Sequence, residues 1–323
     1  MTWAEPSLET KILGLDSEGP SVVAIGGGHG LAQALHAIQT YAGRITAIVT
    51  VADDGGSSGR LIDAMDFPPP GDLRRCLLAL TPQPTLWGEL FAYRFDKSDV
   101  AGHSLGNLML AALTDLLGDF NTALIAAASA LGVQGDVIPA ADRYLRLRAT
   151  VEGRTVEGQV AISEAEGRVE GLELLPGDVE ANRTAVERVA SADQIVLAPG
   201  SLYTSLLSTL IVPGLTEAVD ASPARLAYVL NVVTQASETV GMTGVEHVRA
   251  LHALSGLKRA GTIVDHRGPL DTPSGLQAVA IDEDEAMSLG WDLVQEDLVD
   301  ADARWPQHDP MKLGRALAVL ARR

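Results

Sequence analysis

The chain has 323 residues, of which 46% are hydrophobic but only 4% aromatic, so a core built mainly from Ala, Val, Leu and Ile is expected. Its 42 acidic residues outnumber 24 basic ones and give a formal net charge of -18, which argues against nucleic acid or anionic lipid as a partner. Cys76 is the single cysteine, so an internal disulfide and a thiolate metal cluster are both excluded.

Residues 1–20 are predicted to form a flexible polar tail. The segment MTWAEPSLETKILGLDSEGP has neither the basic start nor the apolar centre of a signal peptide. Along the whole chain, no apolar run reaches the length of about 18 residues that a membrane span needs. We therefore expect a cytoplasmic protein without membrane insertion.

The first structured unit is predicted to be a strand, a glycine loop and a helix. SVVAI, Ser21–Ile25, is a short apolar run, Gly26–Gly30 follows it, and helical spacing begins at Leu31. Backbone amides at such a junction hold phosphate groups. The loop is neither a Walker loop nor a dinucleotide fingerprint, since Leu31 stands where the last glycine would be. A tight turn without a ligand remains the alternative.

A second apolar run, Ile45–Val51, is typical of a buried parallel strand and leads into the polar loop ADDGGSSGR. Two adjacent carboxylates, Asp53 and Asp54, at the carboxyl end of such a strand suit Mg²⁺ or ribose hydroxyls. The following residues free the backbone or supply donors for an anion: Gly55, Gly56, Ser57, Ser58, Gly59 and Arg60. A solvated loop with an Asx turn is the alternative.

Two further motifs follow in a mainly helical stretch. PPPGDLRRC places Gly71 and Asp72 before a helix with Arg74 and Arg75 in its first turn, where basic residues oppose the helix dipole and suggest a nearby anion or a surface salt bridge. Residues 102–106 read G-x-S-x-G, the pattern of a hydrolase nucleophile elbow. The approach to it is polar, however, and a helix follows, so Ser104 is predicted to be a helix N-cap rather than a nucleophile.

The predicted secondary structure changes from helices to antiparallel strands in the middle of the chain. Helices are predicted at 107–117 and 122–131, after which residues 144–151 and 156–162 alternate as antiparallel strands do. The α/β rhythm resumes with a helix at 179–190, strands at 194–198, 226–233, 262–264 and 278–281, and a last helix at 310–320. The predicted fold is a Rossmann-like α/β domain, residues 21–136 and 177–323, with a mostly parallel sheet flanked by helices and a small antiparallel β insertion at 137–176.

Polar residues follow two strands of the second half. Pro199-Gly200-Ser201 repeats the strand–glycine–helix arrangement, with Thr204 and Ser205 near the helix start, and Asn231, Thr234 and Gln235 end another buried strand. Carboxyl ends of parallel strands share one edge of a sheet, so these groups and the earlier loops are predicted to meet in a single crevice.

Taken together, GGGHGL, VTVADDGGSSGRL, PPGDLRRCLLAL, GHSLGNLMLAAL, PGSLYTS, NVVTQ and the late HDP resemble the YvcK family of gluconeogenesis factors. That family is related to CofD, the phospholactate transferase of deazaflavin coenzyme biosynthesis. The resemblance covers about residues 20–320. It implies a regulatory protein that binds a nucleotide sugar such as UDP-N-acetylglucosamine and links carbon metabolism to cell-wall synthesis and cell shape.

The resemblance and the loops together define an expected ligand-binding set, in which Asp53 and Asp54 also form the candidate Mg²⁺ site. No tightly bound cofactor is required, and the candidate protein partners are a second copy of the chain and cell-wall synthesis proteins. A CofD-like, metal-assisted transferase acting on a phosphate-linked substrate is the alternative. One departure is Gln307, where the family pattern has arginine. The expected set is Gly26, Gly27, Gly28, His29, Gly30, Asp53, Asp54, Gly55, Gly56, Ser57, Ser58, Gly59, Arg60, Gly71, Asp72, Arg74, His103, Ser104, Asn107, Gly200, Ser201, Thr204, Asn231, Thr234 and Gln235.

Overall fold

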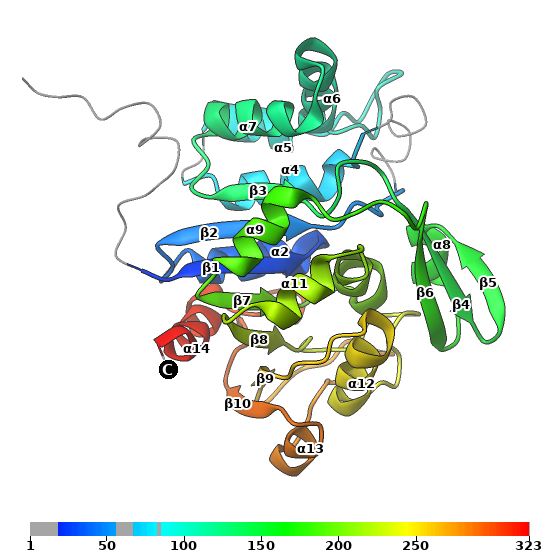
Figure 1. Ribbon diagram of the computed structural model, residues 1–323, viewed down its shortest axis with the longest axis vertical. Coiled ribbons are helices and arrows are strands. Elements are labelled where there is room, and N and C mark those ends of the chain that lie inside the picture. The colour runs from blue at the N-terminus through cyan, green and yellow to red at the C-terminus, as the bar shows by residue number, and fades with distance from the viewer. Residues whose placement is uncertain (1–18, 56–66, 83–84, 323) are drawn as a thin grey trace, which may run out of the picture.

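The structure, a computed structural model, describes residues 19–55, 67–82 and 85–322. Within these residues the chain forms a seven-stranded parallel sheet and a separate three-stranded antiparallel sheet (Figure 1). The predicted α/β class, with a mostly parallel sheet and a small antiparallel insertion, is confirmed. The predicted tail lies outside the described residues except for Gly19 and Pro20.

The parallel sheet has the strand order β10-β9-β8-β7-β1-β2-β3. Its central strands are short runs of Val, Ile, Leu and Ala that are buried on both faces, as expected when helices cover both sides. The strands are β1 (Ser21–Gly26), β2 (Arg44–Val49), β3 (Asp136–Pro139), β7 (Gln194–Leu197), β8 (Arg225–Val229), β9 (Thr262–His266) and β10 (Asp292–Glu296).

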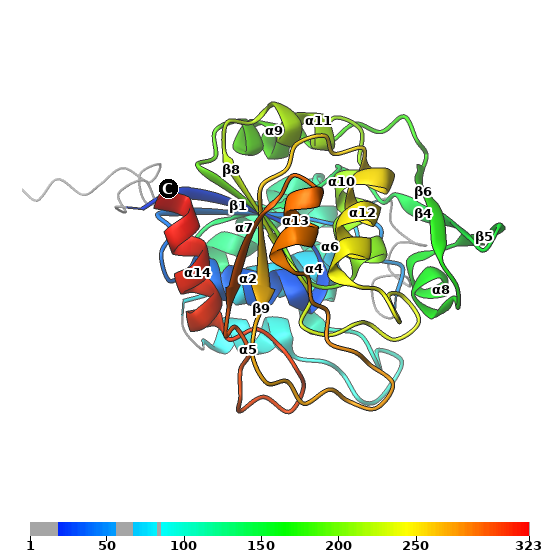
Figure 2. The same ribbon diagram turned by 90° about the horizontal axis from the view of Figure 1, so that it is seen from below.

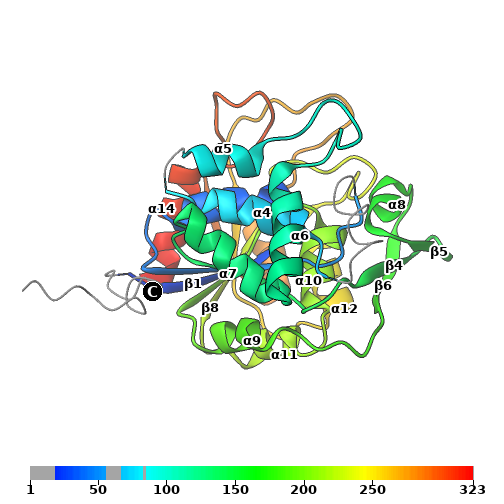
Figure 3. The same ribbon diagram turned by 90° about the horizontal axis from the view of Figure 1, so that it is seen from above.

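Helices cover the two faces of this sheet in separate layers (Figures 2 and 3). One face packs against α2 (Gly28–Ile38), α4 (Pro70–Ala79) and α14 (Pro310–Arg322), and the helices α5 (Leu86–Ala92), α6 (Leu105–Leu117) and α7 (Phe120–Leu131) extend this layer. The other face carries α9 (Arg183–Ala190), the π-helix η1 (Leu202–Leu207), α10 (Ser208–Leu210), α11 (Leu215–Ala221), α12 (Gly244–Ser255) and α13 (Glu283–Ser288).

In the described part of the chain, no single helix has both the length and the apolarity of a membrane span. One bent pair, Leu202–Leu210 with Leu215–Ala221, meets the criterion jointly, and its two parts are inclined at 73°.

The insertion consists of β4 (Arg146–Val151), β5 (Arg154–Glu157), the short helix α8 (Gln159–Glu164) and β6 (Val169–Leu175). Its strands pair in the order β5-β4-β6, and it projects beyond the carboxyl edge of the large sheet (Figures 1 and 3). Leu147, Ala149 and Leu174 face inward and join the core on the η1 side. The insertion is thereby fixed next to the edge at which the parallel strands end.

Three of the predicted segments differ from the structure, and the helices α11, α12 and α13 were not predicted. Residues 159–162, expected as strand, begin α8 because Asp54 binds two amides at its start. In residues 278–281, Val279 and Ile281 are buried as expected, but the segment forms only an isolated β-bridge at Ala278. The seventh strand of the sheet is instead β10, which was not predicted because its ends are charged and its residues are only partly buried. Strand β3 joins the large sheet beside β2, although residues 137–139 fall in the range expected for the insertion.

Candidate functional site

The strand order places a switch point between β1 and β7. From β1 the chain moves outward through β2 to β3, and from β7 it moves in the opposite direction through β8 and β9 to β10. In an open parallel sheet the crevice at such a point, outside the carboxyl ends of the strands, is where ligands bind. The two loops that leave β1 and β7 are the two glycine loops found in the sequence, so the fold brings them together.

These loops are in direct contact. Gly28 has a φ of +63° at the start of α2, a conformation that favours glycine. A Cβ on Gly30 would overlap the carbonyl oxygen of Pro199, so the first turn of α2 lies against the second loop without intervening side-chain atoms. The requirement for glycine at position 30 is therefore steric, as it is where a helix packs closely on a nucleotide-binding loop.

A cavity of about 290 Å³ opens between the loops, and we call it the switch-point cavity. This volume is near the lower end of small-molecule sites. Many of the predicted ligand-binding residues meet here although they are far apart in the sequence. The lining residues are Gly27, Gly28, His29, Gly30, Thr50, Asp53, Asp72, Arg75, Gln159, Gly200, Ser201, Thr204, Ser205 and Gln235.

On the first loop, the helix terminus already has an internal carboxylate beside it. The Gly28 amide donates to Asp72 Oδ2 at 2.7 Å, and Asp72 Oδ1 pairs with Arg75. Burial, followed by the neighbouring Arg75, lowers the pKa of His29. An anionic ligand at this loop would meet His29 and Arg75 but would compete with Asp72 for the Gly28 amide.

On the second loop, the corresponding helix terminus is also satisfied internally. Glu238 is 7% exposed and accepts hydrogen bonds from the amides of Tyr203 (3.2 Å) and Thr204 (2.9 Å) and from the Thr204 hydroxyl (3.1 Å). Burial raises the pKa of Glu238, while these hydrogen bonds act in the opposite direction. Asn231 shapes the same loop, because its amide oxygen and nitrogen bind the Gly200 amide (2.6 Å) and carbonyl (2.8 Å).

The two adjacent aspartates have different surroundings. Asp53 lines the cavity, and its Oδ1 accepts from the Gly55 amide at 3.1 Å. Asp54 turns to the insertion, where its two carboxylate oxygens accept from the Gln159 and Val160 amides, each at 3.0 Å. The expected joint Mg²⁺ site therefore loses one carboxylate to α8, and Mg²⁺ binding through Asp53 stays a prediction. Among the described residues, no three His, Cys, Asp or Glu side chains are grouped as a metal centre requires.

Several predicted residues lie away from the cavity. Arg74 is buried, where it donates to Asn107 Oδ1 (2.9 Å) and to the Phe91 carbonyl (3.2 Å), and burial lowers its pKa to about 10. Ser104 precedes α6 as predicted, but its hydroxyl donates to Phe91 (3.3 Å) instead of capping the helix. A helix follows Ser104, but no strand among the described residues leads into it, so it lacks the strand-to-helix turn of a hydrolase elbow.

The remaining predicted residues divide into three groups. Gly26, Gly71 and His103 do not line the cavity. Gly26 ends β1, Gly71 lies buried in the first turn of α4, and His103 directly precedes Ser104. Thr234 is buried and accepts from the Gln277 amide at 3.0 Å. The others, Gly56, Ser57, Ser58, Gly59 and Arg60, lie outside the described residues.

Sequence reasoning left four lining residues out of the predicted set: Thr50, Arg75, Gln159 and Ser205. Three of them lie within motifs singled out in the sequence: Thr50 in VTVADDGGSSGRL, Arg75 in PPGDLRRCLLAL and Ser205 in PGSLYTS. Gln159 comes from the insertion, and no motif in the sequence marks it as part of the site.

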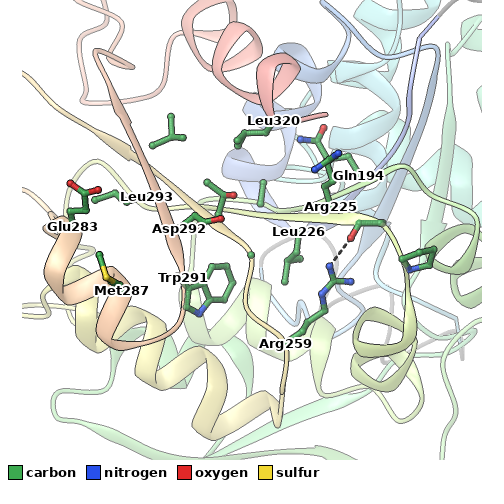
Figure 4. A pocket seen from close by; sticks show the side chains of 16 residues that line it. Gln194, Arg225, Leu226, Arg259, Glu283, Met287, Trp291, Asp292, Leu293 and Leu320 are labelled. Atoms are coloured by element: carbon green, nitrogen blue, oxygen red, sulfur yellow. Dashed lines mark hydrogen bonds between the residues drawn. The ribbon is translucent and has the colours of Figure 1, made fainter. Parts of the chain in front are cut away.

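A second hollow, of about 610 Å³, lies at the opposite edge of the sheet, where β7, β8, β9 and β10 begin (Figure 4). It is larger, but Arg259 on its wall is occupied by the carbonyls of Val219, Ser222 and Ala224. Binding crevices form at the carboxyl edge, so the smaller switch-point cavity is the candidate site.

Comparisons with known proteins show similarity over most of the chain. Residues 22–299 match the family described as 2-phospho-L-lactate transferase CofD. The chain is 40% identical over 306 residues to the gluconeogenesis factor of Halalkalibacterium halodurans, covering 92% of this chain and 95% of that one. It is 38% identical over 312 residues to the gluconeogenesis factor of Bacillus subtilis, covering 93% and 98%. A crystal structure of a Bacillus halodurans protein superposes with a TM-score of 0.89 at 38% identity, covering 93% of this chain and 99% of the other.

Proposed function

Since the chain belongs to the CofD family and, within it, to the gluconeogenesis factors, we propose that its switch-point cavity binds a nucleotide sugar of the UDP-N-acetylglucosamine type. The observation that carries this proposal is the contact of two glycine loops at the switch point, with an aspartate at the end of the neighbouring strand β2. This is the arrangement in which α/β folds hold a nucleotide.

Each part of such a ligand has a suitable neighbour. The diphosphate would lie at the first loop, near His29 and Arg75, where it replaces Asp72 on the Gly28 amide or is bridged to it by a cation. Asp53 follows β2, the position from which an acidic side chain binds ribose hydroxyls. Ser201 and Gln235 on the second loop offer neutral polar groups to sugar hydroxyls.

The proposed role is regulatory. The protein would sense the nucleotide sugar and link carbon metabolism during gluconeogenic growth to cell-wall synthesis and cell shape, through protein partners of the cell-wall machinery. The names of the relatives support the carbon-metabolism part of this role.

A CofD-like transferase is the second candidate, because both Asp53 and Asp72 reach the cavity. They are the carboxylates that would hold Mg²⁺, whose charge would offset charge developing on a transferred phosphate-linked group. Asp54 is excluded from this role as long as it holds α8.

The binding test uses UDP-N-acetylglucosamine and its 2′-deoxyuridine analogue in calorimetry, with and without EDTA. At about 100 times its Kd the ligand should stabilise the fold by roughly 2.7 kcal/mol. If Asp53 binds ribose, the 2′-deoxy analogue should lose about 1–3 kcal/mol and EDTA should matter little. Failure of the wild-type protein to bind any nucleotide sugar would refute the proposal.

Turnover separates the two candidates. The protein is incubated with UDP-N-acetylglucosamine and Mg²⁺, and released UDP is measured against an Asp53→Asn variant. We expect no release above the variant. Sustained release that depends on Mg²⁺ and Asp53 would replace the regulator with the transferase.

A further inference from the structure

Asp54 fixes the start of α8 beside the switch-point cavity. Its Oδ2 accepts from the Gln159 amide and its Oδ1 from the Val160 amide, each at 3.0 Å across more than 100 residues of sequence. Gly158, just before the helix, has a φ of +97°, and a Cβ there would lie 2.5 Å from Asp54 Oδ2. The glycine and the aspartate thus define a tight junction between the insertion and the loop after β2.

This junction brings one insertion side chain into the cavity. Gln159 lines the cavity together with Asp53, and its Oε1 lies 3.8 Å from the position that a Cβ would take on Gly55. Gln159 is half-buried, whereas Glu164 at the other end of α8 is exposed. A neutral amide therefore stands next to the carboxylate of Asp53, while α8 also lies against η1, the helix that follows the second glycine loop.

The position of Asp53 decides which end of the ligand lies there. Strand β2 adjoins β1 on the side opposite β7, and an acidic residue at its carboxyl end is on the ribose side of a bound nucleotide. The sugar end is then directed to the second loop, which leaves β7. Gln159, next to Asp53, lies within reach of the nucleoside.

We propose that Gln159 contacts the nucleoside half of the ligand and that Asp54 is the positioning residue that holds it there. This rests on the proposed function and extends it, because it assigns the insertion a part in ligand recognition. An amide has one acceptor and two donor hydrogens, so it can pair with ribose hydroxyls or with the amide-like edge of a base. A contact with the sugar instead would weaken UDP-N-acetylglucosamine binding and leave UDP binding unchanged.

The first test measures Kd by calorimetry for UDP-N-acetylglucosamine, UDP and inorganic pyrophosphate. Gln159→Ala should weaken the binding of UDP-N-acetylglucosamine and of UDP by the same factor, about three- to tenfold, because the two ligands share the nucleoside. The Kd of pyrophosphate should be unchanged. Glu164→Ala, on the same helix but outside the cavity, is the matched control and should bind all three as the wild type does.

The second test is a double-mutant cycle. Asp54→Asn alone should weaken the two nucleoside ligands, but it should add little to the Gln159→Ala variant, because both changes remove the same contact. If Asp54 had a purely structural role, Asp54→Asn would weaken pyrophosphate binding as well, and its effect on the Kd would add fully to that of Gln159→Ala.

The outcomes distinguish the two proposals. If the wild-type protein binds none of the nucleoside ligands, the proposed function fails and the nucleoside subsite fails with it. If the wild type binds them and Gln159→Ala binds equally well, the function stands and the assignment of Gln159 is overturned. Loss of pyrophosphate binding in Gln159→Ala would also overturn it, since the side chain would then act on the phosphate end.

Discussion

Buried ionisable side chains set both the site and the pH response of this protein. At the cavity, Asp72 and Glu238 accept hydrogen bonds from the amides at two helix starts, so these amides already have partners in the absence of an anionic ligand. Away from the cavity, His308 and His266 are buried near each other, and the Nε2 atom of each has no hydrogen-bond partner among the described residues. The two carboxylates at the cavity affect ligand binding, whereas the two buried histidines affect the stability of the fold.

His308 should make the fold acid-sensitive. Burial, followed by the nearby His266, lowers the pKa of His308 to about 4, whereas the unfolded chain protonates near 6.5. Between these values the unfolded state binds more protons, so the stability present above pH 6.5 is lost as the pH falls towards 4. Going from pH 7 to pH 5 should cost about 2 kcal/mol through this residue.

Urea unfolding at pH 7 and pH 5 measures this loss. His308→Gln has no titrating group at the position, so its stability should differ less between the two pH values, whatever its stability at pH 7. His29 and His247, whose pKa values burial also lowers, remain in the variant and account for a residual slope. Equal pH dependence in the wild type and the variant would contradict the assignment.

Among the secondary-structure elements, the contact between α2 and the loop after β7 is the decisive packing feature. It brings the two halves of the parallel sheet together at the switch point, and it depends on the absence of a side chain at Gly30. A Cβ there meets only backbone atoms of Pro199 and Gly200, which cannot move aside by changing rotamer. Helix propensity and tertiary packing therefore act in opposite directions at this position.

We expect Gly30→Ala to destabilise the protein by about 3 kcal/mol or more, because overlap with backbone forces the two loops apart. Gly88→Ala is the matched control: it lies half-buried within α5, an added Cβ would meet only Thr85 Oγ1 at the ordinary contact distance of 3.4 Å, and the change should be neutral or stabilising by up to about 1 kcal/mol. Chemical unfolding and nucleotide-sugar affinity are both measured. A Gly30→Ala protein as stable as the wild type would show that the loops are not in contact.

At the scale of the whole molecule, charge opposes both compactness and the approach of an anion. The net charge of -18 results from 42 acidic and 24 basic side chains, and among the residues that line the cavity the positive charge comes from Arg75. Such self-repulsion weakens the folded state, and salt screens it over a Debye length of about 10 Å at 0.1 M.

Thermal stability should therefore increase with ionic strength. Raising NaCl from about 20 to 200 mM at pH 7.5 should raise Tm, by about 2 °C for each 1 kcal/mol of repulsion removed. Near the sequence pI of about 4.7 the same addition should have a much smaller effect. Equal increases with NaCl and KCl would exclude a specific ion effect, and an unchanged or lower Tm at pH 7.5 would contradict the prediction.

The sequence by itself determined the features that depend on neighbouring residues. Buried strands, the two glycine loops, most helices and the antiparallel insertion follow from local hydrophobic period and turn chemistry, and the βαβ rhythm orders them into a parallel sheet. Because the carboxyl ends of parallel strands share one edge, it also followed that the loops would converge. The rejection of Ser104 as a nucleophile depended only on its polar approach and the helix after it, and the structure agrees.

Only the tertiary structure decided how distant residues pair. Asp53 and Asp54 are equivalent in the sequence, yet one lines the cavity and the other holds α8 more than 100 residues away. Asp72 reaches the Gly28 amide across 44 residues, and Gln159 enters the site from the insertion. These contacts are fixed by the strand order of the sheet and by the packing of the insertion on the core. Both join segments that are far apart in the sequence, and the local pattern of one segment does not predict which other segment it contacts.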